Sequence, residues 1–245
     1  MNISTIPIDF DEFLLWFQQQ TEEIWSQYNT LTFDDFKRAG VGGSSWRRGT
    51  KWLGGFSEGE IASAEQDWKI HSPPDYRHFL SVLGAPDRTS YGAGWGKAGM
   101  VENKRSSFYN WRKDPELAGA MNWPLDGLYF DLEHNQLWHE RWGNRPDSLE
   151  DQKEKLSKLV QSAPPLIPII GHRYLVGAPI KEGNPVLSVY QSDIVIYGAD
   201  LRKFLINEFS DFFGIDRSEA FRHSVAEFSQ DSIANIPFWG EFIVE

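Results

Sequence analysis

Cysteine is absent from this chain of 245 residues, which excludes disulfide bonds and thiolate metal sites. Uninterrupted apolar runs are also missing at the length of about 20 residues that a membrane-spanning helix needs. The first residues have no positively charged region, and Asp9, Asp11 and Glu12 interrupt their apolar positions, unlike a signal peptide. We therefore expect a soluble, non-secreted protein of the cytoplasm, with no membrane partner.

An excess of positive charge is missing as well. The chain has 24 Lys and Arg residues against 35 Asp and Glu residues, for a formal net charge of −11. A protein that binds nucleic acid normally has the opposite balance, so no nucleic-acid partner is expected. An acidic surface attracts basic partners, although the same acidity also keeps a cytosolic protein soluble.

Signatures of phosphate binding and of nucleophilic catalysis are not found. The glycine-rich stretch YGAGWGKAG lacks the phosphate-loop pattern, and Ser188 and Ser192 lack a G-x-S-x-G elbow. His172 and Arg173 follow a glycine at a strand junction, where an isolated histidine more often holds a turn than performs catalysis. The sequence thus predicts no catalytic residue set and no cofactor.

Aromatic residues are abundant, with 11 Trp and 17 Phe. A chain of this size buries about three quarters of its unfolded surface, so a large core is available for these rings. Sugar-binding platforms and protein interfaces also use aromatic residues, but a large core uses them first.

The first 40 residues have a helical pattern. Apolar residues recur at helical spacing over 9–28, and a second short helix is expected over 33–39, just before Gly40. We interpret residues 1–40 as a helical N-terminal extension and residues 41–245 as the main domain.

The next hundred residues alternate between helices and glycine-rich segments. Ser57 and Glu60 form a capping box that predicts a helix, a proline break and a second helix over 57–84. The segments 40–55 and 85–124 are rich in glycine and are predicted to be mainly loops.

The second half of the chain predicts clustered strands. A hairpin is expected over 128–142, a helix over 148–161, and helices again after Asp200 and over 217–229. Four short strands lie between these helices, with the sequences LIPII, HRYLV, VLSVY and IVIYG. Strands joined by short turns pair antiparallel, so the fold class is predicted to be α+β, with helices packed on a central, mostly antiparallel sheet.

The predicted hairpin holds the highest density of ionisable side chains, which are Asp131, Glu133, His134, His139, Glu140 and Arg141. Such a group could form a metal site or an acid–base pair. Strand alternation, however, directs His134 and His139 to different sides. The pattern favours a charged, solvated sheet face and no metal site.

Two segments resemble the Smi/Knr-type domain of the SUKH superfamily. Residues 52–86, WLGGFSEGEIASAEQDWKIHSPPDYRHFLSVLGAP, are similar to its opening helices, and residues 165–209 resemble the later strands and helix of longer bacterial members. The positions that match the opening motif are Ile61, Glu65, Pro73, Asp75, Tyr76, Phe79 and Leu80.

The resemblance implies an α+β domain without a catalytic residue set. Bacterial members of the superfamily resemble immunity proteins that bind a cognate toxin in the producing cell, and eukaryotic relatives resemble interaction scaffolds. We therefore expect a non-enzymatic, protein-binding immunity protein whose partner is a basic toxin domain. The predicted contact residues are Glu133, His134, Trp138 and Glu140, where acidic and aromatic groups coincide on the hairpin.

Two alternatives remain open at this stage. A hydrolase acting on glycans would need a deep pocket with facing carboxylates, whose separation sequence spacing cannot give. A regulatory scaffold would bind its partner through the N-terminal helices.

Overall fold

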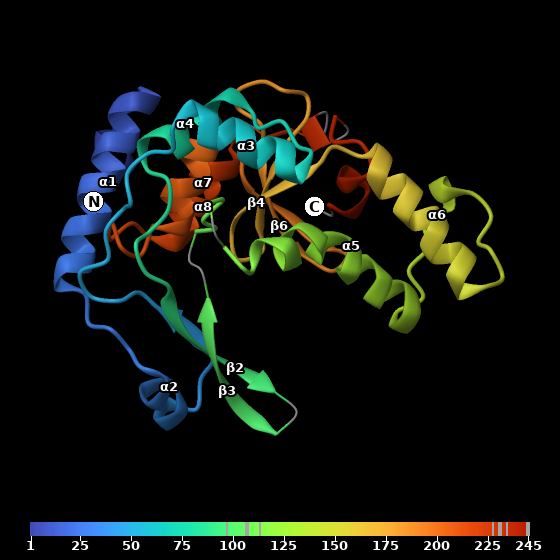
Figure 1. The fold of residues 1–245 in the computed structure, drawn as a ribbon, viewed down its shortest axis with the longest axis horizontal. Helices are drawn as coiled ribbons and strands as arrows, with labels where there is room; N and C mark the ends of the chain where they lie inside the picture. Colours follow the sequence, from blue (N-terminus) through green and yellow to red (C-terminus); the bar gives the residue numbers. More distant parts are fainter. Residues whose placement is uncertain are drawn as a thin grey trace.

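The computed structural model describes residues 1–96, 98–105, 108–112, 114–226, 228–229, 232–233 and 235–243. Parts of the predicted loop over 85–124 and of the predicted helix over 217–229 lie outside these residues. The fold is α+β, as predicted, with two antiparallel sheets and helices on both sides of the larger one (Figure 1).

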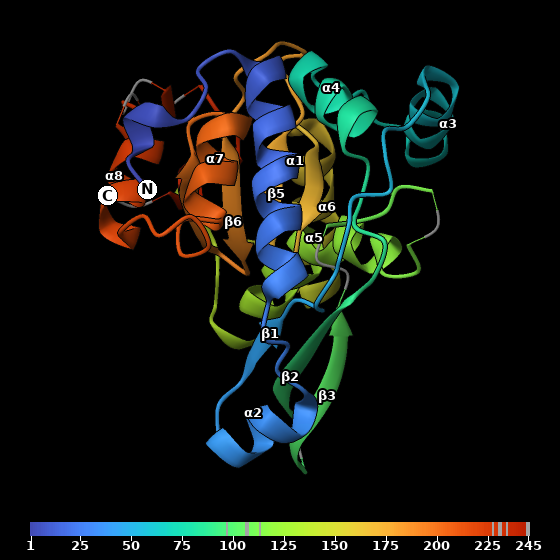
Figure 2. The same cartoon turned by 90° about the vertical axis from the view of Figure 1, so that its left-hand side faces the viewer.

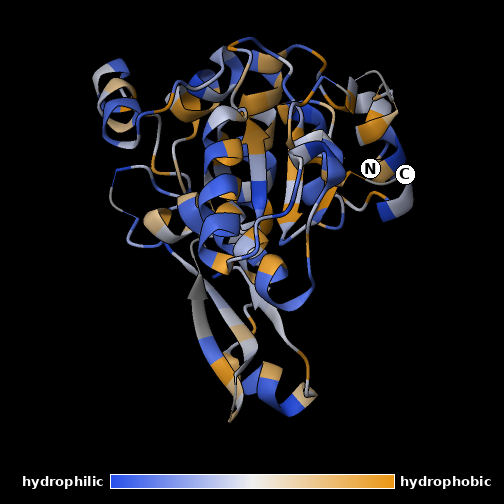
Figure 3. Ribbon diagram, turned by 90° about the vertical axis from the view of Figure 1, so that its right-hand side faces the viewer, coloured by the Kyte–Doolittle hydropathy of each residue, from blue (hydrophilic) through white to orange (hydrophobic). Residues whose placement is uncertain are grey.

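The larger sheet lies in the centre of the molecule and has the strand order β4-β5-β6-β7. Its strands are β4 (Leu166–Ile170), β5 (Arg173–Val176), β6 (Val186–Tyr190) and β7 (Asp193–Gly198). All four pair antiparallel with their sequence neighbours, so the predicted strands and their pairing are confirmed. They are largely apolar, as the orange central ribbons of Figure 3 show, because helices cover both faces.

Alternating side chains of the strands supply two apolar cores. Leu175 and Val186 face a core that also contains side chains of the helices α1, α3, α4 and α7. Tyr174 and Leu187 face the second core, which contains side chains of α5 and α6. The period of two residues along each strand thus gives three layers: helices, sheet and helices.

The helices have the following bounds: α1 (Phe10–Gln27), α2 (Phe33–Ala39), α3 (Glu58–Trp68), α4 (Pro74–Val82), α5 (Leu117–His134), α6 (Leu149–Ser162), α7 (Leu201–Glu208) and α8 (Arg217–Val225). Short 3₁₀ turns are η1 (Ile3–Thr5), η2 (Glu140–Trp142) and η3 (Trp239–Phe242). None of the helices in the described residues combines the length and the apolar character that crossing a bilayer requires.

The N-terminal helix α1 packs into the main core. Its Asp9 cap accepts a hydrogen bond from the backbone of Glu12, and Phe13, Phe17 and Trp25 are fully buried. Phe17 contacts rings from distant parts of the chain, Trp52 and Phe209 among them. The first 40 residues are therefore helical, as predicted, and they share a core with the rest of the chain.

Local capping residues explain where α2, α3 and α4 begin, and the predicted cap of α3 is confirmed. Ser57 and Glu60 form the capping box of α3, and Thr32 forms another at the start of α2. Pro74 occupies the first turn of α4, where its missing N–H costs no hydrogen bond.

A second, three-stranded sheet extends from the body together with α2 (Figures 1 and 2). It consists of β1 (Gly43–Ser45), β2 (Ser90–Gly96) and β3 (Gly99–Arg105), and with α2 we call it the arm. The prediction that 85–124 is mainly loop was wrong, because antiparallel pairing overrides the weak strand propensity of glycine and because α5 begins at Leu117. The segment 40–55 is mainly loop, as predicted, apart from the short strand β1.

The predicted hairpin over 128–142 was also wrong: this segment is the second half of helix α5, followed by a loop and η2. The helix runs through Pro124, which cannot donate a hydrogen bond to the carbonyl of Ala120. The hydroxyl of Tyr174 donates to that carbonyl instead, at 2.9 Å. A partner from the neighbouring sheet therefore makes a proline compatible with this helix.

Close packing of α5 against the central sheet explains why this helix also contains a glycine, Gly127. A side chain at Gly127 would lie only 2.9 Å from the backbone of Gln191, in the β6–β7 turn. One turn later, buried Asp131 accepts a hydrogen bond from the backbone N–H of Ser192 at 2.8 Å. Asp131 thus fixes the turn between two strands instead of forming part of a charged sheet face.

We predict that Tyr174→Phe lowers the free energy of unfolding by about 1–3 kcal/mol, because it leaves the buried Ala120 carbonyl without its partner. The measurement is urea denaturation followed by circular dichroism. Tyr190→Phe is the control, since Tyr190 is exposed on the same sheet. Equal stability of Tyr174→Phe and the wild type would contradict the role given to this hydroxyl.

Candidate functional site

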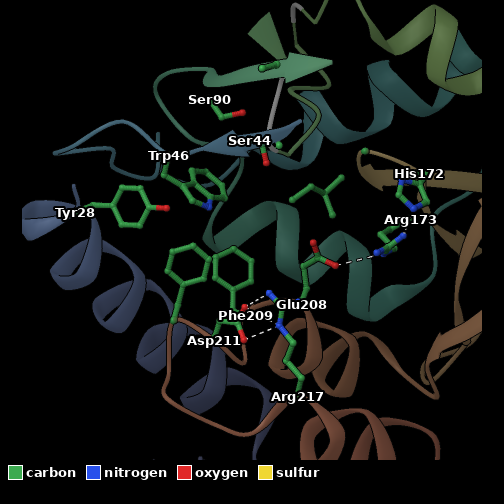
Figure 4. Close-up of a pocket in the computed structure, with 15 residues that line it drawn as sticks. Tyr28, Ser44, Trp46, Ser90, His172, Arg173, Glu208, Phe209, Asp211 and Arg217 are labelled. Carbon is green, nitrogen blue, oxygen red and sulfur yellow. Dashed lines mark hydrogen bonds and ion pairs between the residues drawn. The ribbon is translucent and has the colours of Figure 1, made fainter. Parts of the chain in front are cut away.

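A cavity of about 760 Å³ lies where α1, the arm, the β4–β5 turn and the end of α7 meet (Figure 4). We call it the junction cavity. Its volume is typical of small-ligand sites, and it combines aromatic walls with a few polar groups. The lining side chains come from the end of α1 (Tyr28), from the arm and the residue that follows β1 (Ser44, Trp46, Ser90), from the central sheet (Ile170, His172, Arg173) and from α7 to α8 (Glu208, Phe209, Asp211, Phe212, Arg217).

Arg173 connects the central sheet to the last residue of α7. Its Nε donates to Oε2 of Glu208 at 3.3 Å, and its Nη1 donates to Oγ of Ser188 at 2.7 Å and contacts Nε2 of His172. The guanidinium plane also lies over the ring of Tyr197, 3.8 Å from its centroid. Antiparallel pairing places Arg173 opposite Ser188, so the register of β5 and β6 determines this arrangement.

The side chain of Glu208 lines the junction cavity, and 23% of it is exposed. Burial raises its pKa above the ordinary value, although Arg173 and Arg217 act in the opposite direction. Only Oε2 accepts a hydrogen bond from another residue in the described part of the chain, and Oε1 has none. Glu208 therefore offers an acceptor oxygen to the cavity.

A second ion pair lies near the mouth. Nε of Arg217, the first residue of α8, lies 2.7 Å from each carboxylate oxygen of Asp211. This hydrogen bonding lowers the pKa of Asp211. The Arg217 side chain is 80% exposed, so the pair is accessible to solvent and contributes little to stability.

Four aromatic rings form a continuous wall of the cavity. Trp46 and Phe209 have ring centroids 5.9 Å apart, Phe209 and Phe212 are 5.6 Å apart, and Phe212 and Tyr28 are 5.7 Å apart. Phe209 is buried, whereas Tyr28 and Phe212 are only half-buried. Such a wall binds apolar or planar groups and, through its ring faces, cations.

Metal binding is not supported by the side-chain arrangement. Among the described residues, no three His, Asp or Glu side chains come together as potential metal ligands. Within the described residues, His134 and His139 therefore belong to no such group of ligands.

The four predicted contact residues lie on the other side of the central sheet, at the end of α5 and in the turn that follows it. Glu133 and His134 are exposed, and Glu133 forms an ion pair with Lys153. The ring of His134 stacks on Phe130, and its Nδ1 lies 2.9 Å from the Phe130 carbonyl oxygen.

Trp138 and Glu140 follow in the turn. Trp138 is half-buried, and its Nε1 donates to the carbonyl of Gly143 at 2.8 Å. The ammonium of Lys155 lies 5.4 Å from its ring centroid. Glu140 is exposed in η2. The structure thus brings these residues to one end of the molecule, but in a surface of mixed charge and without a hairpin.

Sequence reasoning identified some residues of the junction cavity and missed others. His172 and Arg173 of the lining were recognised separately, as was Ser188, which contacts Arg173 without lining the cavity. Glu208, Asp211 and Arg217 were missed, although an acidic residue at the end of an amphipathic helix, where the helix dipole disfavours it, was a usable signal. Tyr28 and Trp46 come from the first 46 residues, and only the fold brings them to the site.

Comparison with protein-family models, with curated proteins and with solved structures finds no match to this chain. The resemblance to the Smi/Knr-type domain therefore rests on residues 52–86 and 165–209 and stays a prediction.

We predict that Glu208 makes stability depend on pH. Since burial raises the pKa of Glu208 above its ordinary value of 4.5, the folded chain holds this proton more tightly than the unfolded chain. Its contribution is fully present below pH 4.5 and is lost as the pH rises through the raised pKa. As the pH is raised from below 4.5 to above the raised pKa, the free energy of unfolding should decline less for Glu208→Gln than for the wild type. Glu140→Gln, on the exposed turn, is the control, and an unchanged slope in Glu208→Gln would contradict the assignment.

Proposed function

We propose that this protein is a non-enzymatic binding module that neutralises a basic toxin domain, as an immunity protein of the producing bacterium. The proposal joins the resemblance to the Smi/Knr-type domain with the electrostatics of the folded chain. It places the protein in the cytoplasm, where a producing cell needs such protection.

The observation that carries the proposal is the charge of the N-terminal segment. The first 36 residues contain seven acidic residues and no Lys or Arg; the acids are Asp9, Asp11, Glu12, Glu22, Glu23, Asp34 and Asp35. All of these acidic residues except Glu22 and Asp35 are exposed. Helix α1 lies on the surface of the body and runs towards the arm (Figure 2), so it presents an acidic face to a partner.

The arm and the junction cavity adjoin this acidic face. Trp95, on β2, is 69% exposed and offers an aromatic ring of the kind that anchors protein interfaces. Tyr28, at the end of α1, lines the junction cavity. Helix α1 therefore carries exposed acids and ends at the cavity, and the arm offers an exposed aromatic ring, which supports a contact with another macromolecule.

The acidic face gives the proposal a physical mechanism. A protein with net charge −11 attracts a basic domain during diffusional encounter, and it competes with the polyanion that a basic nuclease binds. Short-range contacts on the arm and around the cavity would then determine which partner remains bound.

We predict that the double variant Gln19→Lys with Glu23→Lys slows association with the cognate basic toxin domain about ten-fold at low salt, because it removes local attraction. Both positions are exposed on α1. Association rates are measured by stopped-flow fluorescence, and neutralisation is scored as growth of cells that express the toxin. The difference should shrink as salt screens the charges.

Glu154→Lys with Gln161→Lys is the matched control, because it makes the same change of charge on exposed positions of α6, at the other end of the molecule (Figure 1). Glu140→Lys tests the alternative contact surface of Glu133, His134, Trp138 and Glu140. Equal slowing by the α1 and α6 pairs would reject the α1 face as the steering surface. Failure of the wild type to bind or neutralise any basic toxin encoded beside its gene would reject the function.

A glycan hydrolase is the second candidate, and one observation favours it. Two carboxylic acids line the junction cavity, and their pKa values shift in opposite directions: burial raises that of Glu208, and hydrogen bonds from Arg217 lower that of Asp211. Such a difference is typical of an acid and a base that act together. Each carboxylate already has an arginine partner, however, which makes binding the better-supported function.

If the cavity hydrolyses glycans, Glu208→Gln and Asp211→Asn should each reduce the rate at least about 100-fold, which is the contribution of a general acid or base. The assay is reducing-sugar release from a panel of bacterial cell-wall and plant oligosaccharides, with Glu182→Gln as the exposed control. No hydrolysis by the wild type would eliminate this candidate.

A further inference from the structure

The junction cavity contains a carboxylate whose hydrogen-bonding capacity is only partly used. Oε2 of Glu208 accepts from Arg173, whereas Oε1 accepts from no other residue in the described ranges. In Figure 4 the Glu208 carboxylate lies at the centre of the lining side chains. A partly desolvated carboxylate gains more from a cationic hydrogen-bond donor than an exposed one does, because water screens the attraction less.

The charge of each arginine near Glu208 is already opposed by a carboxylate, which argues against an anionic ligand. Arg173 contacts Glu208, Ser188, His172 and the ring of Tyr197. An anion would have to compete with these groups for its donors. Arg217 likewise has its charge opposed by the carboxylate of Asp211.

The aromatic wall favours a cation that is planar. Trp46, Phe209, Phe212 and Tyr28 line the cavity in a continuous series. A guanidinium group can stack on aromatic rings and donate in its own plane to a carboxylate, whereas an ammonium is a compact point charge. An arginine side chain therefore matches this combination better than a lysine side chain.

The chain itself contains this kind of contact at the mouth of the cavity. Nε of Arg217 donates to both carboxylate oxygens of Asp211 and its Nη2 donates to Oδ2, and its side chain is 80% exposed. A guanidinium from another molecule could approach along the same side and continue to Glu208. The cavity volume of about 760 Å³ is ample for one arginine side chain and the adjacent peptide groups.

We propose that the junction cavity is the receptor for one arginine side chain of a basic protein partner, with Glu208 Oε1 as the acceptor and the half-buried rings of Tyr28 and Phe212, beside Trp46, as the stacking surface. This inference deepens the proposed function and rests on it for the origin of the arginine. The arm and the acidic face of α1 bring the partner close, and the cavity recognises a single side chain.

The test uses a small probe, so that it does not depend on knowing the partner. The full-length protein is titrated with N-acetyl-arginine methylamide, and binding is followed through the indole N–H signal of Trp46 by nuclear magnetic resonance. Trp46→Phe assigns that signal. N-acetyl-citrulline methylamide is the matched ligand control, because it has nearly the same shape and no charge.

The expected result is saturable movement of the Trp46 signal with the arginine probe, and binding at least about ten-fold weaker for the citrulline probe. Glu208→Gln should weaken binding of the arginine probe by a similar factor, whereas Glu140→Gln should not. Phe212→Ala removes part of the wall while leaving Glu208 in place, and it should also weaken binding. Thermal unfolding of each variant shows whether it is folded.

Several results would overturn the inference. These are no movement of the Trp46 signal with the arginine probe, equal binding of both probes, and movement of the signal by inorganic phosphate instead. Failure of this inference is separable from failure of the proposed function. If Glu208→Gln and Phe212→Ala bind and neutralise a toxin domain like the wild type, while the α1 pair does not, the function stands and the cavity is not the arginine receptor.

Discussion

The Arg173 guanidinium joins the central sheet to the helical layer on one of its faces, and the geometry of the junction cavity depends on it. The side chain leaves β5 on the same face as Leu175, where α7 packs, and it contacts the last residue of that helix. Its remaining contacts with Ser188 and Tyr197 fix it to β6 and β7. A single half-buried cation thus fixes Oε2 of Glu208, and Oε1 of the same carboxylate keeps its capacity to accept from a ligand.

In the proposed binding mode, the acidic face of α1 and the junction cavity act over different distances. Exposed acids on α1 attract a basic partner over about a Debye length, and this attraction weakens as salt is added. Glu208 acts only at contact distance, where partial burial reduces screening. Charges on α1 can therefore change how fast a partner arrives without changing which side chain the cavity accepts, so speed and specificity have separate physical origins.

Local signals predicted most of the fold, and tertiary contacts account for the main errors. The strands of the central sheet and the caps at Asp9, Ser57 and Asp200 follow from periodicity and short-range hydrogen bonding. Helix α5 could not be predicted in this way, because the Tyr174 hydroxyl compensates for Pro124 and close packing requires Gly127. In both places a residue that breaks helices locally is stabilised by a distant part of the chain.

The candidate site was harder to predict than the fold because its residues are distant in sequence. Tyr28 and Trp46 lie more than 160 residues before Glu208, and nothing in the spacing relates them. The ionisable density around Glu133 drew attention to a surface where Lys153 already opposes the charge. The number of charged side chains in a segment was therefore a poor guide. Burial, and the presence or absence of a partner, determine whether a charged group can bind a ligand, and both are properties of the folded chain.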